Sequence, residues 1–544
     1  MEPSPWNSWM INRLTRALFA RRFVPLGSPA RPRGWLGSQR FDEHWTSTSQ
    51  CPPPHVASSR NLNGRNNHMT DTDTAARSIR SWLGIPYAAA ERFRRPTLLP
   101  FNPDLPYDKK GAAPMQAGDT GWLEADNGFS EDCLNLNVWA PEDVGNEPLP
   151  VVVYIFGGGF ELGANTQTTS NASGLATTGR AVGVSLNYRL GPFGWLSLSQ
   201  YGGVFADATN LGLQDIITAL QWVRVNIARF GGDPDNVTVT GHSAGAFATL
   251  SLLAAPSADG LYRRLAAFSG MASRLVPAWG AEERALEVLT RLGIQDDPEQ
   301  LLNIDAMLLA ETMSKTQLAD PGARHGIDNT VIAIVDDHSQ PGGVIAHHPL
   351  RVLESGRHRD IDIFLSSTTH ETDWWVLHKT DDFDPGSISE LVKEFAARNR
   401  IPRSRARAII AAYDIDGRTP IEVRGALLTD FSFTLPHVRA ALAHAAAGGN
   451  AHLLSVGPVE GAHAVHGTEM YGIVGQERPG ASAQQIVRDT FIRDTLLDFA
   501  EGNRGRLWTA VTTKPTTRGI GNLPYDATTH AVEVLKTFEG IERP

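Results

Sequence analysis

The chain contains little cysteine and no long apolar run, and both shortages exclude classes of protein. Two cysteines, Cys51 and Cys133, occur among 544 residues, too few for the disulfide framework of a small secreted domain. No run reaches the roughly 18 apolar residues that a membrane-spanning helix needs, and the N-terminus lacks the charged-then-apolar pattern of a signal peptide. We therefore expect a cytoplasmic protein with no membrane partner.

Basic charge is also scarce. The chain has 49 Lys and Arg against 59 Asp and Glu, giving a net charge of −10, whereas nucleic-acid-binding proteins carry a clustered basic surface. A nucleic-acid partner is therefore not expected, and a small uncharged molecule is. The sequence gives no indication of a metal or organic cofactor and does not define the oligomeric state.

The first 68 residues differ in composition from the rest. They are rich in Arg, Pro, Ser and Asn, contain few acids and have no sustained periodicity, so they cannot bury enough apolar surface to offset the entropy of ordering. We expect this segment to be disordered. Its Arg-rich start is compatible with an organelle transit peptide, but we favour a non-native extension with a natural start at Met69. Residues 69–544 are expected to form a single domain.

Apolar runs alternate with a helical pattern in the remainder. Valine-rich runs at 148–156 and 181–188 are typical of strands buried on both faces. The segment 211–227 spaces its apolar residues three and four apart, which predicts one buried helix face. Strands alternating with helices favour an α/β fold with a mostly parallel sheet. Further strands are expected at 236–241, 265–270, 361–367 and 451–457.

One serine lies between a predicted strand and a predicted helix. The run Gly241-His242-Ser243-Ala244-Gly245 has the Gly-x-Ser-x-Gly pattern of a nucleophile elbow, which requires a strand before the serine and a helix after it. Both are expected here, and the two glycines would leave no Cβ where strand and helix crowd together. An ordinary N-cap serine is the alternative.

A run of three glycines, 157–159, follows the strand predicted at 148–156. It would let backbone N–H groups approach a substrate closely, and attack on a carbonyl creates an oxyanion that needs such donors. We predict an oxyanion hole formed by the N–H groups of Gly158, Gly159 and Ala244. A flexible turn and a phosphate cradle are alternatives, the latter disfavoured because the chain has no Gly-Lys-Ser/Thr motif.

A nucleophilic serine needs a base, and the base needs an orienting acid. His463 and His466 follow the strand predicted at 451–457, and Glu371 and Asp373 follow the strand predicted at 361–367. The chain order of Ser243, then an acid, then a histidine is typical of α/β-hydrolases. The residues alone leave the choice within each pair open.

Several longer stretches resemble the type-B carboxylesterases, the family that includes bacterial p-nitrobenzyl esterases and the cholinesterases. The segment SEDCLNLNVWAP at 130–141 resembles that family's second signature, and GIPYA, NYRLGPFGWLS and FGGDPDNVTVTGHSAGA match further stretches in order. The resemblance covers residues 78–544. It implies an α/β-hydrolase fold, with a mostly parallel central sheet flanked by helices and with large insertions covering the active site.

The resemblance also implies roles for individual residues. Ser243 would be the nucleophile, Glu371 the acid and His466 the base, because HGTE at 466–469 resembles the family's His-Gly-x-Glu and SSTTHET occupies the place of its acid motif. Glu469 would be a buried structural acid. The implied oxyanion-hole donors are again Gly158, Gly159 and Ala244.

The chain departs from the family pattern at several positions. Phe156 stands where many members have histidine, and Thr372 replaces the glycine after the acid. His242 replaces the glutamate before the nucleophile, which weakens any case for cationic choline esters. Cys133 matches a half-cystine of the animal enzymes, but Cys51 is not at the partner position, so two free thiols are expected.

These assignments predict a serine carboxylesterase that hydrolyses a small-molecule ester through an acyl-enzyme. A catalytically inactive adhesion or scaffold protein on the same fold is one alternative, and a lipase, thioesterase or amidase with the same triad is another. The substrate pocket is expected to be walled by insertions between about 270 and 450, with Trp374 and Trp375 either lining it or filling the core.

Overall fold

The computed structural model describes residues 77–541 except 119, 122, 144, 272–274, 317–331, 341, 374–383 and 416. The extension predicted at 1–68, together with Cys51, Trp374 and Trp375, lies outside the described residues. Cys133 is buried and free, as expected. None of the described helices is both long and apolar enough to cross a membrane.

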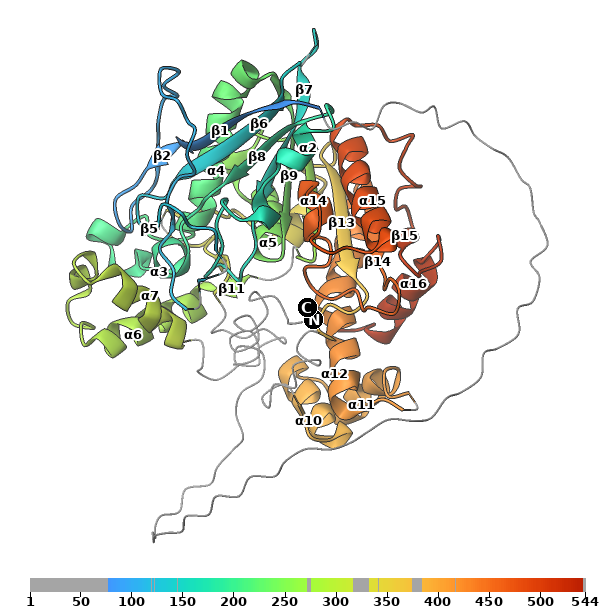
Figure 1. The fold of residues 1–544 in the computed structure, drawn as a ribbon. Coiled ribbons are helices and arrows are strands. Elements are labelled where there is room, and N and C mark those ends of the chain that lie inside the picture. The colour runs from blue at the N-terminus through green and yellow to red at the C-terminus, as the bar shows by residue number, and fades with distance from the viewer. Residues whose placement is uncertain are drawn as a thin grey trace, which may run out of the picture. The chain divides into compact units, whose positions relative to one another are not determined.

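A nine-stranded sheet forms the centre of the described part of the chain, in the order β1-β6-β8-β7-β9-β10-β13-β14-β15 (Figure 1). The first two pairings, β1 with β6 and β6 with β8, are antiparallel, and all pairings from β8 to β15 are parallel. This confirms the α/β class with a mostly parallel sheet. The strands are β1 (Ile79–Pro86), β6 (Asn135–Pro141), β7 (Leu149–Ile155), β8 (Val182–Leu186), β9 (Gly232–His242), β10 (Arg264–Phe268), β13 (Asp362–Thr368), β14 (Ala451–Val456) and β15 (Thr517–Ile520).

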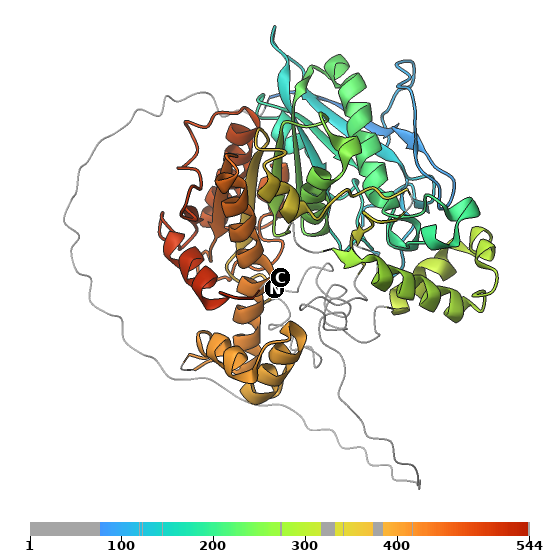
Figure 2. The same cartoon turned by 180° about the vertical axis from the view of Figure 1, so that it is seen from behind.

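Helices cover both faces of the sheet. Val151, Val152 and Val153 of β7 are all completely buried although neighbouring side chains of a strand point to opposite faces. In both views α4 (Leu211–Asn226) and α15 (Ala483–Ala500) lie on opposite sides of these strands (Figures 1 and 2). The helix predicted over 211–227 is thus confirmed as α4. Other helices near the sheet are α2 (Ser173–Ala176), α3 (Gly191–Trp195), α5 (Ala244–Ser251), α8 (Pro349–Ser355), α14 (Met470–Val474) and α16 (Thr528–Thr537).

Two helical insertions leave the sheet within the expected range of about 270–450. The first lies between β10 and β13, and the second, between β13 and β14, has its own apolar core, which includes Phe395, Ile409 and Phe431. In the second insertion a short π-helical segment, Asp430–Thr434, joins two α-helices. The insertion helices are α6 (Ala278–Leu292), α7 (Ala306–Thr316), α10 (Ile388–Asn399), α11 (Arg403–Ala411), α12 (Pro420–Thr429) and α13 (Leu435–Ala446).

A buried ion pair ties the segment after β8 to α4. The guanidinium of Arg189 donates from Nε and Nη2 to the two carboxylate oxygens of Asp215 at 2.8 and 2.7 Å, with side chains 4% and 0% exposed. On either side of this anchor, the hydroxyl of Tyr188 donates to the carbonyl of Phe156 at 2.9 Å and the N–H of Gly191 donates to that of Phe160 at 2.8 Å. The ion pair therefore supports the glycine loop after β7.

Removing one partner of this pair should destabilise the protein strongly, because the other charge stays buried without compensation. We expect Arg189→Met to lower the free energy of unfolding by about 3–5 kcal/mol, measured by urea unfolding followed by circular dichroism. Arg291→Met is the matched control, since Arg291 forms an exposed pair with Glu287 on α6 and should cost less than about 1 kcal/mol. Equal unfolding midpoints for the two variants would contradict this role.

Candidate active site

Ser243 occupies a strained turn between β9 and α5. Its backbone has φ 55° and ψ −123°, a conformation that non-glycine residues rarely adopt. The turn is possible because its neighbours have no side chain: a Cβ on Gly241 would lie 2.4 Å from the backbone of Gly245, and one on Gly245 would lie 2.1 Å from the carbonyl oxygen of Ile155. Ser243 makes no side-chain capping bond to α5. The alternative of an ordinary N-cap serine is therefore wrong.

The structure brings Ser243, His466 and Glu371 into one hydrogen-bonded line. His466 Nε2 lies 2.9 Å from Ser243 Oγ, and His466 Nδ1 lies 2.7 Å from Glu371 Oε2. The three residues follow strands β9, β14 and β13, which form one run of parallel strands with β10 and therefore have their carboxyl ends at one edge of the sheet. The side chains are nearly inaccessible to solvent, with Glu371 0% exposed. This geometry matches that of a nucleophile, a base and an orienting acid.

The other predicted acid and histidine pair with each other instead. His463 Nδ1 lies 2.7 Å from Asp373 Oδ2, and the His463 side chain is 48% exposed. Among the described residues, the imidazole within hydrogen-bonding distance of Ser243 is that of His466, not that of His463. The sequence left open the choice between two acids and between two histidines. In the structure, Glu371 and His466 are the pair that reaches Ser243.

A second buried carboxyl group, Glu469, lies behind Glu371. The hydroxyl of Ser269 is 2.6 Å from both Glu371 Oε1 and Glu469 Oε2, and Ser366 Oγ donates to Glu469 Oε1. A hydroxyl carries one proton, so Ser269 donates to one carboxylate and the second bond requires a proton on the other acid. Burial, followed by the charge of Glu371, raises the pKa of Glu469 to about 8. Glu469 is thus the protonated partner, and Glu371 keeps the charge that faces His466.

His242 is buried directly before the nucleophile. Its ring centroid lies 4.7 Å from that of His466, and neither of its ring nitrogens has a hydrogen-bond partner among the described residues. Burial, with a contribution from His466, lowers the pKa of His242 well below its ordinary value. The ring is therefore neutral, so this position carries no charge where the family pattern has a carboxylate.

The glycine run after β7 lies beside the serine. A Cβ on Gly157 would lie 2.9 Å from Ser243 Cβ, which shows how closely the loop passes. Gly158 and Gly159 have φ values of 124° and 64°, in the region that favours glycine. Within the described part of the chain, no group accepts a hydrogen bond from the N–H of Gly158, Gly159 or Ala244. These three amides are available as donors to an oxyanion.

Two residues at the site were not predicted as such from the sequence. Ser269 follows β10 without any motif that distinguishes it, and Phe433 lies in the π-helical segment of the second insertion, 5.5 Å between ring centroids from His466. π-Helical turns are frequent at functional sites, but their sequence carries no distinct pattern. Phe433 brings the insertion into contact with the base.

Phe156 stands where the family pattern has a histidine. Its carbonyl accepts a hydrogen bond from the hydroxyl of Tyr188, and the rings of the two residues stack with their centroids 4.6 Å apart.

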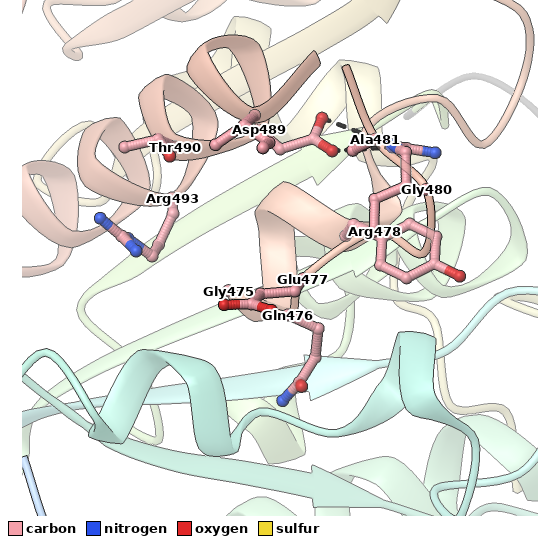
Figure 3. Close-up of a pocket in the computed structure, with 11 residues that line it drawn as sticks. Gly475, Gln476, Glu477, Arg478, Gly480, Ala481, Asp489, Thr490 and Arg493 are labelled. Atoms are coloured by element: carbon pink, nitrogen blue, oxygen red, sulfur yellow. Dashed lines mark hydrogen bonds and ion pairs between the residues drawn. The ribbon is translucent and has the colours of Figure 1, made fainter. Parts of the chain in front are cut away.

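A cavity of about 400 Å³ lies elsewhere, between α14 and α15 (Figure 3). Arg478 at its edge donates to Asp489 at 2.8 Å and lies over the ring of Tyr471 at 4.6 Å. None of the residues lining this cavity belongs to the hydrogen-bonded line or to the glycine loop. It is therefore not the place where Ser243 would meet a substrate.

Substituting the two oxyanion-hole glycines should separate steric damage from backbone strain. In Gly158→Ala the new Cβ would lie 2.1 Å from the carbonyl oxygen of Leu162, which displaces the loop, whereas Gly159→Ala meets open space. Because losing one donor costs about 10²–10³-fold in kcat, we expect the kcat of Gly158→Ala to fall by that factor and the kcat of Gly159→Ala to fall by less. Steady-state assays of ester hydrolysis measure both. Gly128→Ala, with φ 71° and open space far along the chain, is the strain control and should keep its kcat. An unchanged kcat in Gly158→Ala would overturn the assignment.

The shared hydroxyl predicts a specific pH dependence of stability. The pKa of Glu469 is raised from 4.5 to about 8, so between these values the native state holds a proton that the unfolded chain has released. The contribution of Glu469 to the free energy of unfolding is therefore complete below pH 4.5 and is lost as the pH rises toward about 8. We expect Glu469→Gln to remove this loss, so that its urea midpoint relative to the wild type rises between pH 5 and pH 9.

The exposed carboxyl of Glu299 provides the control for this measurement. Glu299→Gln should leave the difference between pH 5 and pH 9 as it is in the wild type. The protonation of Glu469 would be disproved by a Glu469→Gln variant whose midpoint shifts with pH in parallel with the wild type.

Comparisons with known proteins show a family match over most of the chain. The model of the carboxylesterase family matches residues 56–487. The chain is 39% identical over 256 residues to para-nitrobenzyl esterase of Bacillus subtilis, covering 45% of this chain and 51% of that protein. It is 30% identical over 349 residues to an acetylcholinesterase of Leptinotarsa decemlineata, covering 56% and 53%. The chain thus spans about half the length of these curated relatives.

A solved structure extends the likeness to nearly the whole fold. A PNB esterase superposes with a TM-score of 0.71 and 27% sequence identity, covering 85% of this chain and 97% of that chain. The expected α/β-hydrolase fold is confirmed by this match together with the mostly parallel sheet.

Proposed function

Because the chain belongs to the carboxylesterase family, we propose that it hydrolyses carboxylic esters through an acyl-enzyme intermediate. The observation that carries the proposal is the unbroken line from Ser243 Oγ through His466 to Glu371, at 2.9 and 2.7 Å. A serine hydroxyl is a weak nucleophile until a base accepts its proton, and the base is effective only when a third group fixes its ring.

In the first half of the reaction, Ser243 Oγ attacks the carbonyl carbon of the ester while His466 Nε2 accepts the hydroxyl proton. The carbonyl oxygen becomes an oxyanion and receives hydrogen bonds from the amides of Gly158, Gly159 and Ala244. Glu371 stabilises the imidazolium that forms. As the carbon–oxygen bond to the alcohol breaks, His466 returns the proton to the leaving alcohol, and the acyl group stays on the serine.

In the second half, a water molecule replaces the alcohol. His466 accepts a proton from the water as its oxygen attacks the acyl carbon, and the same amides receive the second oxyanion. Collapse of this intermediate breaks the bond to Ser243 Oγ, which takes the proton back from His466. The carboxylic acid leaves and the free enzyme is restored.

The substrate we propose is a small uncharged ester. Two groups in contact with His466 are neutral: the buried ring of His242 and the aromatic ring of Phe433. A cationic alcohol group would find no compensating charge from His242, whereas an aryl or alkyl ester needs none. The name of the para-nitrobenzyl esterase relative supports esters whose alcohol group carries an aromatic ring as the first substrates to test.

Replacing the members of the line should abolish hydrolysis without unfolding the chain. With p-nitrophenyl acetate and butyrate, we expect Ser243→Ala and His466→Ala to lower kcat/KM by about 10³-fold or more, and Glu371→Gln by a comparable factor. The release of p-nitrophenol measures the rate, and circular dichroism checks the fold. His338→Ala removes an exposed imidazole that also has a carboxylate partner, Asp336, and should keep the wild-type rate.

Three results would change the conclusion in different ways. A folded wild type that is inert on short-chain, long-chain, thioester and amide substrates would favour a non-catalytic role on the same fold. A Ser243→Ala variant with the wild-type rate would mean that another group is the nucleophile. A preference for long acyl chains, thioesters or amides would keep the triad and redefine the substrate.

A further inference from the structure

Two histidines and an aspartate gather beside the active site without taking part in the hydrogen-bonded line. His370, Asp373 and His463 each offer a ligand atom, and these atoms all lie within 4.8 Å of one another. The rings of His370 and His463 stack with centroids 4.1 Å apart, and His463 Nδ1 is 2.7 Å from Asp373 Oδ2. Among the described residues, this is the one cluster of such groups that could hold a metal ion.

The backbone holds the two segments that carry these side chains in register. The N–H of His370 donates to the carbonyl of Ala464 at 3.1 Å, and His370 forms a parallel β-bridge with Val465. These contacts join the segment after β13 to the segment after β14. The three side chains are therefore positioned by main-chain hydrogen bonds as well as by their own contacts, which lowers the cost of assembling a site.

One ring nitrogen is also fixed from outside the cluster. Thr369 Oγ1 lies 2.8 Å from His370 Nδ1, which leaves Nε2 of that ring for another partner. Metal-binding histidines commonly use their second nitrogen for a contact of this kind, since it fixes the tautomer and the direction of the ring. The exposed side of the cluster is His463, at 48%, and it provides a path for an ion from solvent.

We propose that His370, Asp373 and His463 form a binding site for a divalent transition-metal ion, for which Zn²⁺ is the probe. Two imidazoles and one carboxylate are ligands that Zn²⁺ accepts, and three protein ligands leave a position for water. A tetrahedral ion brings its ligand atoms to about 3.4 Å from one another, so rotations of these side chains are enough to close the site. The ion takes the place of the proton between His463 Nδ1 and Asp373, and the neutral imidazole then carries its one proton on Nε2.

The position of the site gives the ion a structural consequence. His370 and Asp373 flank Glu371, and His463 lies three residues before His466. A bound ion would therefore cross-link the two segments that carry the acid and the base. Because an ion that binds the folded chain better than the unfolded chain stabilises the folded state, Zn²⁺ should raise the unfolding temperature.

The test is Zn²⁺ binding to the chelator-treated full chain, measured by isothermal titration calorimetry at pH 7.5. We expect the wild type to bind one Zn²⁺ per chain that His463→Asn and Asp373→Asn do not bind. Thr369→Val keeps all three ligands and should weaken the binding by about 10–100-fold. Zn²⁺ should raise the unfolding temperature of the wild type more than that of His463→Asn.

The matched control is His338→Asn. His338 and Asp336 form an exposed pair at 2.7 Å but belong to no three-residue cluster among the described residues, so its loss should leave the stoichiometry at the wild-type value. The proposal is overturned if folded His463→Asn and Asp373→Asn bind as much Zn²⁺ as the wild type, or if the His338 variant loses the same ion. Calorimetry requires no turnover, so its outcome stands apart from that of the ester assays.

Discussion

The charge of Glu371 is the constraint around which the active-site edge of the sheet is built. Its side chain is fully buried, and a carboxylate in such a place is stable only when neighbours donate hydrogen bonds to it or carry the opposite charge. The hydroxyl of Ser269, the N–H of Thr368 and the ring of His466 each satisfy one direction. These contacts also join the segments after β10, β13 and β14. The same hydrogen bonds therefore compensate the charge of Glu371 and position the base.

Close backbone contacts position the nucleophile, as hydrogen bonds position the acid. Gly245 leaves α5 in contact with the end of β7, and Gly157 lets the next loop pass within a side chain's width of Ser243. The nucleophile and the oxyanion donors consequently belong to one crowded unit. The buried pair of Arg189 and Asp215 holds the segment after β8, from which the hydroxyl of Tyr188 donates to the carbonyl of Phe156 in that unit.

Local patterns were enough to predict the elbow, the helix α4 and six of the nine strands of the central sheet, since each depends on residues close together in the chain, whereas β1, β6 and β15 were not predicted. The run at 148–156 became β7, and the glycines around Ser243 could be interpreted from backbone crowding alone. The choice of acid and base rested on the family resemblance, because the side-chain patterns of the candidates were equivalent. Ser269 and Phe433 reach the site through contacts between distant segments, and no local pattern encodes those contacts.

The hydrogen bonds of the line join residues 223 and 95 positions apart in the chain. Contacts of such long range form late, since the entropy of closing large loops must be overcome first. During synthesis, Ser243 and Glu371 leave the ribosome well before His466, so a growing chain has its nucleophile but no base. Recovery of esterase activity after dilution from denaturant would therefore report the final docking of the carboxyl-terminal strands, a step that spectroscopic probes of helix content do not resolve.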